Sequence, residues 1–537
     1  MSLIQHIRTV AAGLAATLLA VACGGLDVEF PPEQPDGYLT LLRYYQKGEE
    51  FVSCKSMDIT TLLTFGYSTL SLKHSDLEVH DCTATGRPPI CVDDTGSYWL
   101  IGGKNSWIGY HKGFLDKDAQ PVYLYFDAEG LHLFISNGNV LDFPKLDASF
   151  IPETFVVPTV YISYGSGSIS KDTYKDMEII INDPSSHYSE ATRMTAKGQI
   201  KGRGNSTWGM PKKPYRIKLS EKAEVLGMPA NKDWVLLANY ADKSLLRNTT
   251  AMQVSRILEF PWTPRSRQVE LYLNNTYMGV YDLFEHKEVA KEKVNIEKQD
   301  WYLEIEQTID EKYYFYTSKG VPIQVKHPSE PTSEQLAYIK GYFKDFEAAL
   351  FGSSFKDAAK GYAAYIDVES FVDNYIIEEL SKDIDGNVRK SSFLTLCEGG
   401  KLRFYHQWDF DLAFGNADYF PGNANGPTGW WIKDYGTNST KNNGWYWRLF
   451  QDPAFVGKVK QRWAEVYPDL VNVPKYIDKA KSEMGYATTR NFNKWKILNT
   501  YVWPNVKVTG SYDKEVEYLE SFYNDRLEWL NNNLPKL

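Results

Sequence analysis

FYHQWDFDLAFGN, residues 404–416, is the stretch around which this chain can be interpreted. Its two carboxylates, Asp409 and Asp411, alternate with large apolar side chains, which is unlike a strand that faces water. In an extended segment, residues two apart point the same way, with about 6–7 Å between their Cα atoms. Burying an unpaired carboxylate costs several kcal/mol, so we expect this pair to bind a cation. Oxygen ligands suit Mg²⁺ or Mn²⁺, and a structural Ca²⁺ site would use the same residue types.

An amphipathic helix and an acidic loop precede this stretch in the sequence. Apolar residues recur at helical spacing from Val368 to Ile376, and Asp367 is a suitable N-cap, so a helix is predicted over residues 367–380. The loop KDIDGN, residues 382–387, follows it. Asp385 in this loop could accept a proton or bind a second metal ion, which makes it a candidate catalytic residue.

A glycine-rich turn between two strands is the next candidate, in KGQIKGRGNSTW, residues 197–208. Its glycines would let backbone N–H groups approach an anion, and its polar side chains could add donors. The candidate residues of this turn are Gly202, Arg203, Gly204, Asn205 and Ser206. In the following segment PKKPYRIKL, residues 211–219, strand alternation places Lys218 and Ile217 on opposite faces of the strand. Lys218 could reach the same anion, although basic strand residues often face only water.

A short polar helix is predicted after residue 242. Asp242 could cap a helix that carries the segment LLRN, residues 245–248. Composition favours a solvated polar face that contains Arg247 and Asn248.

A hairpin is predicted over residues 269–285, because two apolar runs flank the turn residues Asn274 and Asn275. Glu285 ends the second strand, where its carboxylate would pair with a lysine or face solvent.

The remaining pattern divides the chain into a strand-rich part and a helical part. Short strands separated by turns are predicted from residue 37 to about 150, including a hairpin of residues 122–126 and 131–135, and no catalytic motif lies there. Strands continue from residue 157, and helices dominate after residue 333. The expected fold class is therefore α+β.

The ordered motifs resemble the CotH kinase family of spore-coat-protein-H-like atypical protein kinases. The resemblance covers about residues 157–535 and rests on the segments GRGNSTW, PKKPYRIKL, LLRN, GVYDLFE, DIDG, WDFDLAFG and WYWRLFQDPAF. It implies a divergent, two-lobed protein-kinase-like domain that uses ATP and a divalent metal to phosphorylate Ser in proteins. By the same resemblance Asp385 would be the general base, and Asp409 and Asp411 would hold the metal. Residues 202–206, Lys218 and Glu285 would contact the nucleotide.

The N-terminus has the features of an export signal. An apolar run too short to span a bilayer ends at LAVAC, in which Cys23 resembles a lipidated cysteine. The expected organisation is a lipoprotein signal peptide over residues 1–22, a tether over 23–36, a small β-rich domain over 37–150 and the kinase-like domain over 157–535. The protein would then be an exported lipoprotein of the outer membrane or cell surface, attached to the membrane only by its lipid.

Bulk composition restricts the possible partners. The formal net charge of −9 argues against a general nucleic-acid binder. The chain has 15 Trp, 37 Tyr and 26 Phe, a content that fits a large aromatic core and, less well, carbohydrate stacking. Because ATP is scarce outside the cytoplasm, an alternative is a non-catalytic surface lipoprotein that binds a glycan or a protein. The leading hypothesis is an ATP-dependent kinase whose partner is a protein with Ser acceptors.

Overall fold

The computed structural model describes seven strands between residues 40 and 142, and then residues 157–183, 188–189, 193–274, 276–386, 388–419, 426–435 and 444–537. The predicted signal peptide, Cys23 and the tether lie outside the described residues. The chain divides into two compact units, which are described separately. The first comprises residues 1–238, 267–283 and 482–495, and the second comprises residues 239–266, 284–481 and 496–537. Among the described helices, none is both long enough and apolar enough to cross a membrane.

A seven-stranded antiparallel sheet forms the N-terminal part of the first unit. Its strands are β1 (Thr40–Gln46), β2 (Leu77–Val79), β3 (Tyr98–Gly102), β4 (Ser106–His111), β5 (Pro121–Phe126), β6 (Leu131–Ile135) and β7 (Asn139–Asp142). They lie in the order β2-β1-β3-β4-β5-β6-β7. The predicted hairpin is confirmed, because β5 and β6 pair in antiparallel register with Phe126 opposite Leu131.

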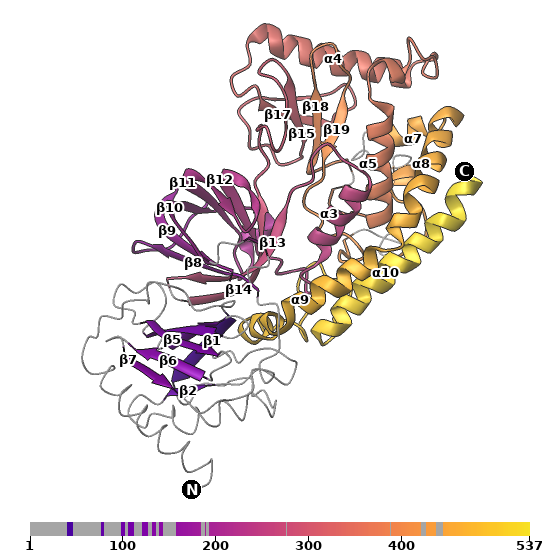
Figure 1. Ribbon diagram of the computed structural model, residues 1–537. Helices are drawn as coiled ribbons and strands as arrows, with labels where there is room; N and C mark the ends of the chain where they lie inside the picture. The colour runs from indigo at the N-terminus through magenta and orange to yellow at the C-terminus, as the bar shows by residue number, and fades with distance from the viewer. Residues whose placement is uncertain are drawn as a thin grey trace. The chain divides into compact units, whose positions relative to one another are not determined.

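A closed β-barrel forms the rest of the first unit (Figure 1). Its strands are β8 (Thr159–Tyr164), β9 (Lys175–Asn182), β10 (Arg193–Gly202), β11 (Tyr215–Val225), β12 (Met228–Leu237), β13 (Ser266–Leu273) and β14 (Thr276–Glu285). Parallel pairing of β8 with β13 closes the barrel, with Val160 opposite Leu271. Strand alternation on β11 turns Ile217 into the barrel core, whereas Lys218 points outward and is exposed.

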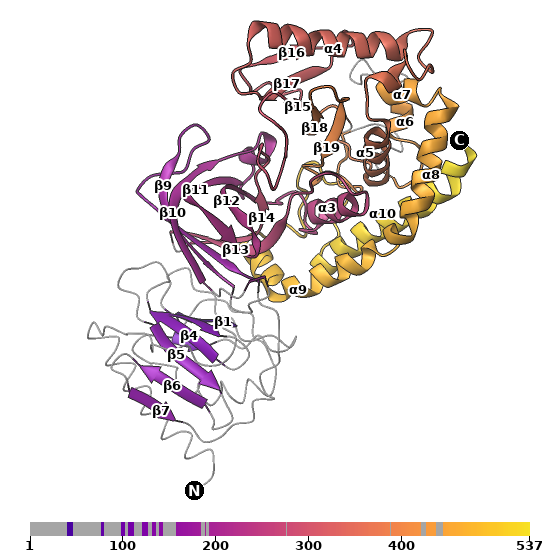
Figure 2. The same ribbon diagram turned by 45° about the horizontal axis from the view of Figure 1, so that its top comes forward.

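A five-stranded antiparallel sheet lies in the second unit. Its strands are β15 (Trp301–Ile305), β16 (Tyr314–Tyr316), β17 (Pro322–His327), β18 (Ser392–Leu396) and β19 (Arg403–His406), in the order β16-β17-β15-β18-β19. Helix α4 (Ser333–Phe351) runs beside β16 and β17 in Figure 1 and Figure 2. Phe315 of β16 packs edge-on against Phe343 of α4, with 5.5 Å between ring centroids. This contact buries one face of the helix against the sheet.

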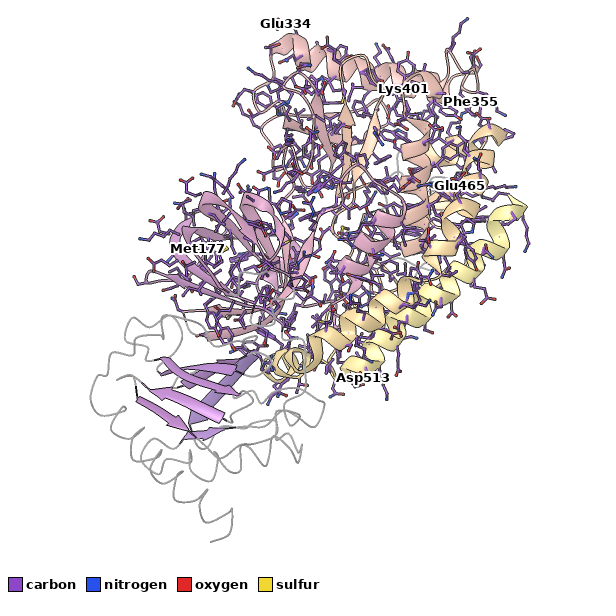
Figure 3. All side chains as sticks on the ribbon, in the orientation of Figure 1. Met177, Glu334, Phe355, Lys401, Glu465 and Asp513 are labelled. Atoms are coloured by element: carbon purple, nitrogen blue, oxygen red, sulfur yellow. The ribbon has the colours of Figure 1, made fainter. Side chains whose placement is uncertain are left out.

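Helices make up the remainder of the second unit. They are α3 (Arg247–Ile257), α5 (Val368–Ser381), α6 (Ile432–Tyr435), α7 (Trp445–Leu449), α8 (Pro453–Leu470) and α10 (Tyr512–Asn533), with α9 (Val473–Lys494) divided between the two units. Side chains of the described residues are drawn in Figure 3, with Glu465 on α8 and Asp513 at the start of α10. The helix predicted at residues 367–380 is confirmed as α5, and the predominance of helices after residue 333 is confirmed by α4 to α10.

Helix α5 is the buried axis of this unit. Asp367 caps it as predicted, because its carboxylate accepts a hydrogen bond of 3.0 Å from the Ser370 backbone N–H. The helix ends at Lys382, whose backbone adopts the left-handed conformation (φ 45°). Nearly all of its side chains are buried, so the loop that follows begins inside the unit rather than at its surface.

The aromatic content forms the core of the second unit. The Phe346 and Trp445 ring centroids are 5.1 Å apart, and those of Phe371 and Phe404 are 4.7 Å apart, both in edge-to-face contact. All four side chains are buried. The Phe371 and Trp445 ring centroids are 6.4 Å apart, so α4, α5 and α7 are joined to strand β19. That strand leads into residues 407–416, the Asp409 segment.

Candidate functional site

Two loops of the second unit bring the acidic residues of the sequence motifs into electrostatic reach of one another. Asp383 and Asp385 follow α5, and Asp409 and Asp411 follow β19. Burial and the neighbouring Asp385 carboxylate raise the pKa of Asp383 to about 7. Burial and the charge of Asp409, with smaller contributions from Asp242, Asp385 and Asp383, raise the pKa of Asp411 well above its usual range. Within this acidic cluster (Asp383, Asp385, Asp409 and Asp411), burial and the neighbouring carboxylates therefore oppose the ionisation of Asp383 and Asp411, and a bound cation would relieve that repulsion.

The Asp409 segment is not an extended strand, so this part of the sequence-based prediction is wrong. Strand β19 ends at His406, and Asp409 adopts a left-handed backbone conformation with φ 73°. Such a conformation costs a non-glycine residue about 1–3 kcal/mol and is concentrated at functional sites. The segment turns because its backbone is held from two sides. Phe410 N–H donates to Asn248 Oδ1 at 2.8 Å, and Phe414 N–H donates to the Ser381 carbonyl at 2.7 Å.

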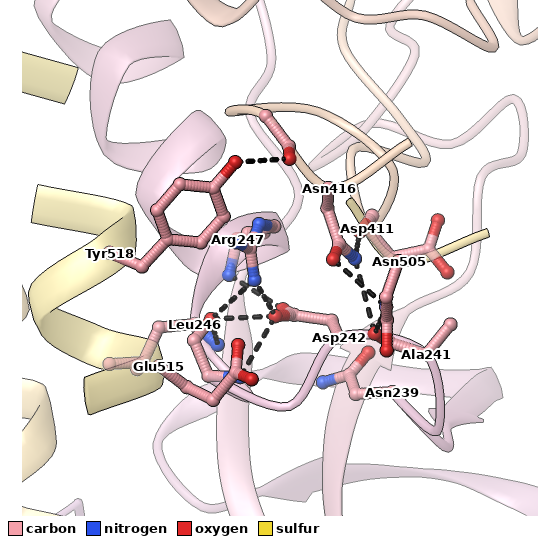
Figure 4. Close-up of polar contacts among 12 residues, drawn as sticks. Asn239, Ala241, Asp242, Leu246, Arg247, Asp411, Asn416, Asn505, Glu515 and Tyr518 are labelled. Carbon is pink, nitrogen blue, oxygen red and sulfur yellow. Dashed lines mark hydrogen bonds and ion pairs between the residues drawn. The ribbon is translucent and has the colours of Figure 1, made fainter. Parts of the chain in front are cut away.

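Two further asparagine side chains, Asn416 and Asn505, support the segment next to Asp411 (Figure 4). Asn416 Nδ2 donates to the Asp411 carbonyl at 2.8 Å and to the Ala241 carbonyl at 3.2 Å. Asn505 Nδ2 in turn donates to Asn416 Oδ1 at 3.0 Å. The carbonyl of Asp411 is thus held by the buried amide of Asn416, which Asn505 in turn holds from a distant part of the chain.

A buried ion pair lies at the start of α3. Arg247 Nη1 is 2.6 Å from Asp242 Oδ1, and the Arg247 backbone N–H donates to Asp242 Oδ2 at 2.9 Å. Neither side chain is exposed, and Asn248 is only 3 % exposed. The predicted solvated face of this helix is therefore wrong. The cap predicted at Asp242 is wrong as well, because α3 begins at Arg247 with Leu246 as its N-cap and without a side-chain cap bond. Asp242 instead accepts from the first helical N–H, that of Arg247, and Asn248 points into the protein and binds the Phe410 backbone.

Three side chains surround the carboxylate of Asp385. Its Oδ1 accepts hydrogen bonds from Lys390 Nζ at 2.9 Å and from the Tyr419 hydroxyl at 2.8 Å, and Arg389 Nη2 lies 3.8 Å away. Burial and the Asp385 charge raise the pKa of Tyr419, so its hydroxyl stays a donor. These contacts orient the carboxylate of Asp385, and its two cationic neighbours, Lys390 and Arg389, follow it closely in the sequence.

Glycine at position 386 is required by close packing against Asp383. A Cβ atom at Gly386 would lie 2.1 Å from Asp383 Oδ2. The other oxygen of Asp383, Oδ1, accepts a hydrogen bond of 3.1 Å from the Asp385 backbone N–H. The DIDG sequence therefore couples the positions of the two carboxylates.

A lysine that the sequence analysis did not select also belongs to this unit. Lys287 Nζ is 2.6 Å from Glu304 Oε1 and lies 4.0 Å above the Phe393 ring and 5.7 Å from the Trp408 ring centroid. Lys326 binds the other oxygen of Glu304 at 3.2 Å. Two cations therefore share one buried carboxylate. The sequence offers one signal for Lys287, its place just after the hairpin that ends at Glu285.

The predicted anion-binding turn belongs to the first unit, whereas the acidic residues belong to the second. Gly202 N–H donates to the Ser170 carbonyl at 2.7 Å, and Arg203 N–H donates to the Pro214 carbonyl at 3.2 Å. A Cβ atom at Gly202 would lie 2.3 Å from the Trp208 ring, so packing by itself accounts for this glycine. Asn205 and Ser206 are exposed, as is Lys218.

Glu285 is held by an arginine and does not face solvent. It is fully buried, and Arg265 Nη1 lies 2.7 Å from its Oε1. The Arg265 backbone N–H donates to Glu285 Oε2 at 2.9 Å. Neither environment expected from the sequence, a lysine partner or open solvent, is the one found.

The donor chemistry of the acidic cluster fits a divalent cation. In the described part of the chain, no three His, Cys, Asp or Glu side chains converge closely enough to form a metal site as they stand. Within that same part, Asp383 and Asp411 form no ion pair, and burial together with carboxylate repulsion raises the pKa of each. Oxygen ligands of this kind suit Mg²⁺ or Mn²⁺, and Asp409 and Asp411 are the residues that would hold the ion.

Comparison with known proteins identifies one match. The family described as CotH kinase protein matches residues 200–530, which is more than half of the chain. The matched region contains the acidic cluster, Lys287 and most of the glycine-rich turn. No curated protein matches the chain.

Proposed function

The chain belongs to the CotH kinase protein family, and on that premise we propose that it is an atypical protein kinase that transfers the γ-phosphate of ATP to Ser hydroxyls of a protein substrate. The observation that supports this proposal most is the group of carboxylates in the second unit, in which burial and neighbouring carboxylates raise the pKa values of Asp383 and Asp411. A cluster of this kind is unfavourable without a cation and suited to a metal-bound phosphate. The two-lobed, kinase-like character of the domain is part of the proposal.

Asp385 is the proposed catalytic base. Its carboxylate accepts the proton of the substrate Ser hydroxyl as the Ser oxygen forms a bond to the γ-phosphorus. The bond between that phosphorus and the bridging oxygen breaks, and ADP leaves with the electron pair. Lys390 and Tyr419 orient Asp385 through their contacts with its Oδ1. Catalysis of this type depends mainly on positioning and charge neutralisation.

Asp409 and Asp411 are the proposed metal ligands. When bound, a divalent cation neutralises the charge of the transferred phosphate. Asn248, Asn416 and Asn505 hold the backbone on which these ligands are carried. The strained φ of Asp409 is maintained by that support.

A lysine is proposed to meet the phosphates of ATP. The sequence pattern favours Lys218, which is exposed on β11 of the first unit. The contacts of the second unit favour Lys287, because Glu304 and the Phe393 ring hold its ammonium group in a fixed place within that unit. Lys287 also lies against Trp408, the residue before Asp409. Substitution of each lysine distinguishes the two candidates.

Location at a membrane is proposed from the sequence alone. The apolar N-terminal run and Cys23 favour export and attachment by lipid. The acceptor would then be a protein of the cell surface or outer membrane.

Thermal unfolding with ATP and Mn²⁺ or Mg²⁺ tests the proposed site. At a ligand concentration of 100 Kd, binding stabilises the wild type by about 2.7 kcal/mol. The expected result is a metal-dependent rise in Tm that Asp409→Ala abolishes. The absence of any shift at millimolar nucleotide would refute the kinase proposal and leave the glycan- or protein-binding alternative.

A further inference from the structure

A basic cavity lies in the second unit, outside the acidic cluster. Its volume is about 540 Å³, which is within the range of small-ligand sites. Three segments form its wall: the end of α3 with the chain that follows it, the loop of residues 291–295, and Tyr405 of β19. None of the carboxylates assigned to the proposed catalytic site lines it.

The wall of this cavity carries more positive than negative charge. Four cationic side chains line it, with Glu292 as the only acidic one; the cations are Arg256, Arg265, Lys291 and Lys293. Two of them are already paired, Arg265 with Glu285 at 2.7 Å and Lys293 with Glu288 at 2.8 Å. Among the described residues, Arg256 and Lys291 form no ion pair, and both are exposed. These two side chains are available to an anion in solution.

The paired cations give the cavity a rigid wall. Lys293 is 2 % exposed, and its Nζ donates to the His286 carbonyl at 2.8 Å in addition to Glu288. The backbone N–H of Asn295 donates to the Tyr405 hydroxyl at 3.0 Å, which ties the loop to β19. A ligand would therefore meet a preformed surface and would lose little affinity to ordering of the protein.

Three aromatic side chains, those of Phe260, Trp262 and Tyr405, form a further part of the wall. Trp262 is 5 % exposed, and its indole Nε1 has no acceptor within the described residues. That nitrogen is itself buried, so Trp262 presents ring surface to the cavity and no donor that a ligand could reach. Phe260 and Tyr405 provide apolar surface for the part of the ligand that bears the anion.

We propose that this cavity binds the phosphate of a phosphorylated Ser or Thr residue in a protein partner, with Arg256 and Lys291 as the cations that meet it. A phosphate monoester carries close to two negative charges at neutral pH, so it can balance the charges of both Arg256 and Lys291. A carboxylate carries a single negative charge and would balance only one of them. Arginine also binds phosphate oxygens through two parallel N–H groups. The volume exceeds that of an isolated phosphate, so the residues that flank the phosphorylated side chain would occupy the remainder. This binding is separate from catalysis and does not require it.

Fluorescence anisotropy of a labelled phosphoserine peptide with the full-length protein tests this proposal. Matched peptides carry Ser or Glu in place of phosphoserine. The double variant Arg256→Ala/Lys291→Ala should weaken phosphopeptide binding by at least roughly tenfold. Lys340→Ala/Lys344→Ala is the matched control, since it removes two positive charges from exposed positions on α4 of the same unit. This control and Asp409→Ala should each bind the phosphopeptide as the wild type does.

Four results would overturn the proposal. Equal binding by the Arg256→Ala/Lys291→Ala variant and the wild type would exclude the cavity. Equal losses in both double variants would indicate general electrostatic attraction. Loss in Asp409→Ala alone would place the peptide at the acidic cluster. Displacement of the peptide by inorganic phosphate at a concentration near the peptide Kd would mean that the cavity takes free phosphate instead.

Discussion

Asn248 accepts a hydrogen bond of 2.8 Å from the backbone N–H of Phe410, which lies 162 residues later in the sequence. Both partners are buried and cannot bind water in the folded protein, so this bond satisfies both polar groups. Phe410 lies between Asp409 and Asp411. The first turn of α3 therefore fixes the backbone on which the two proposed metal ligands are carried.

Replacing Asn248 with Ala is expected to destabilise the protein by about 1–3 kcal/mol, because the Phe410 N–H would be left without an acceptor. Metal-dependent stabilisation by ATP should fall as well, since the Asp409 backbone would lose its support. Urea unfolding with and without ATP and Mn²⁺ measures both effects. Asn472→Ala is the control, because Asn472 is exposed and donates to the Pro468 carbonyl one turn away in its own helix region. A fall in stability with nucleotide binding unchanged would mean that Asn248 supports only the fold.

Stability without metal should depend on pH through Asp383. Its pKa is raised from an ordinary value of about 3.9 to about 7, so the stability that its protonated form contributes is present below pH ~4 and lost as pH rises through 7. Asp383→Asn keeps the acceptor oxygen without the charge. The variant should therefore gain stability relative to the wild type between pH ~4 and ~7, as measured by urea unfolding in EDTA. Adding Mn²⁺ at neutral pH should shrink the difference, and a difference that is constant with pH would contradict this assignment.

Lys287→Met is expected to remove most of the stabilisation by ATP, because it deletes the cation that lies over Trp408, the residue before Asp409. Lys326→Met is the matched control, since it also takes one of two lysines from Glu304. Lys218→Met in the same thermal-shift series tests the lysine that the sequence pattern selects. Loss of the ATP effect in Lys218→Met but not in Lys287→Met would assign the phosphate contact to β11.

Tyr419→Phe is expected to lower the rate of phosphoryl transfer by about tenfold or more without changing nucleotide affinity, because it removes one of the donors that orient Asp385. The Phe ring would keep the stacking of Tyr419 on Trp503, with 5.8 Å between centroids. Tyr501→Phe controls for loss of a hydroxyl nearby, since that hydroxyl donates to Asp418 at 2.8 Å. Equal rates in Tyr419→Phe and the wild type would remove Tyr419 from the account.

The features predictable from the sequence are those that local patterns determine. Helix α5, its cap at Asp367 and the turn at Asn274 each depend on residues a few positions apart. The acidic residues of the site could also be selected, because carboxylates among large apolar side chains are unusual in any fold. The number and type of these carboxylates therefore predict a cation site, but their positions relative to one another cannot be predicted from the sequence.

Contacts between distant segments could not be predicted from one sequence. Closure of the barrel requires β8 to pair in parallel with β13, about a hundred residues later. The turn at Asp409 follows from its support by Asn248, which no pattern near Asp409 reveals. Arg247 looked like a surface residue because arginine usually is one, and its burial becomes understandable only with Asp242 placed beside it. Lys287 could not be selected from the sequence either, since its partner Glu304 lies on β15, 17 residues later.

The most direct test of the central claim is transfer of labelled γ-phosphate from ATP to protein Ser in the presence of Mn²⁺ or Mg²⁺, with phosphoserine identified by mass spectrometry. The purified protein would be assayed on itself and on a serine-rich acceptor such as casein, beside Asp385→Asn and Asp409→Asn. The account predicts labelled phosphoserine with the wild type and none with either variant. Wild-type protein that binds ATP and metal but transfers no phosphate, or variants that transfer as well as the wild type, would contradict it.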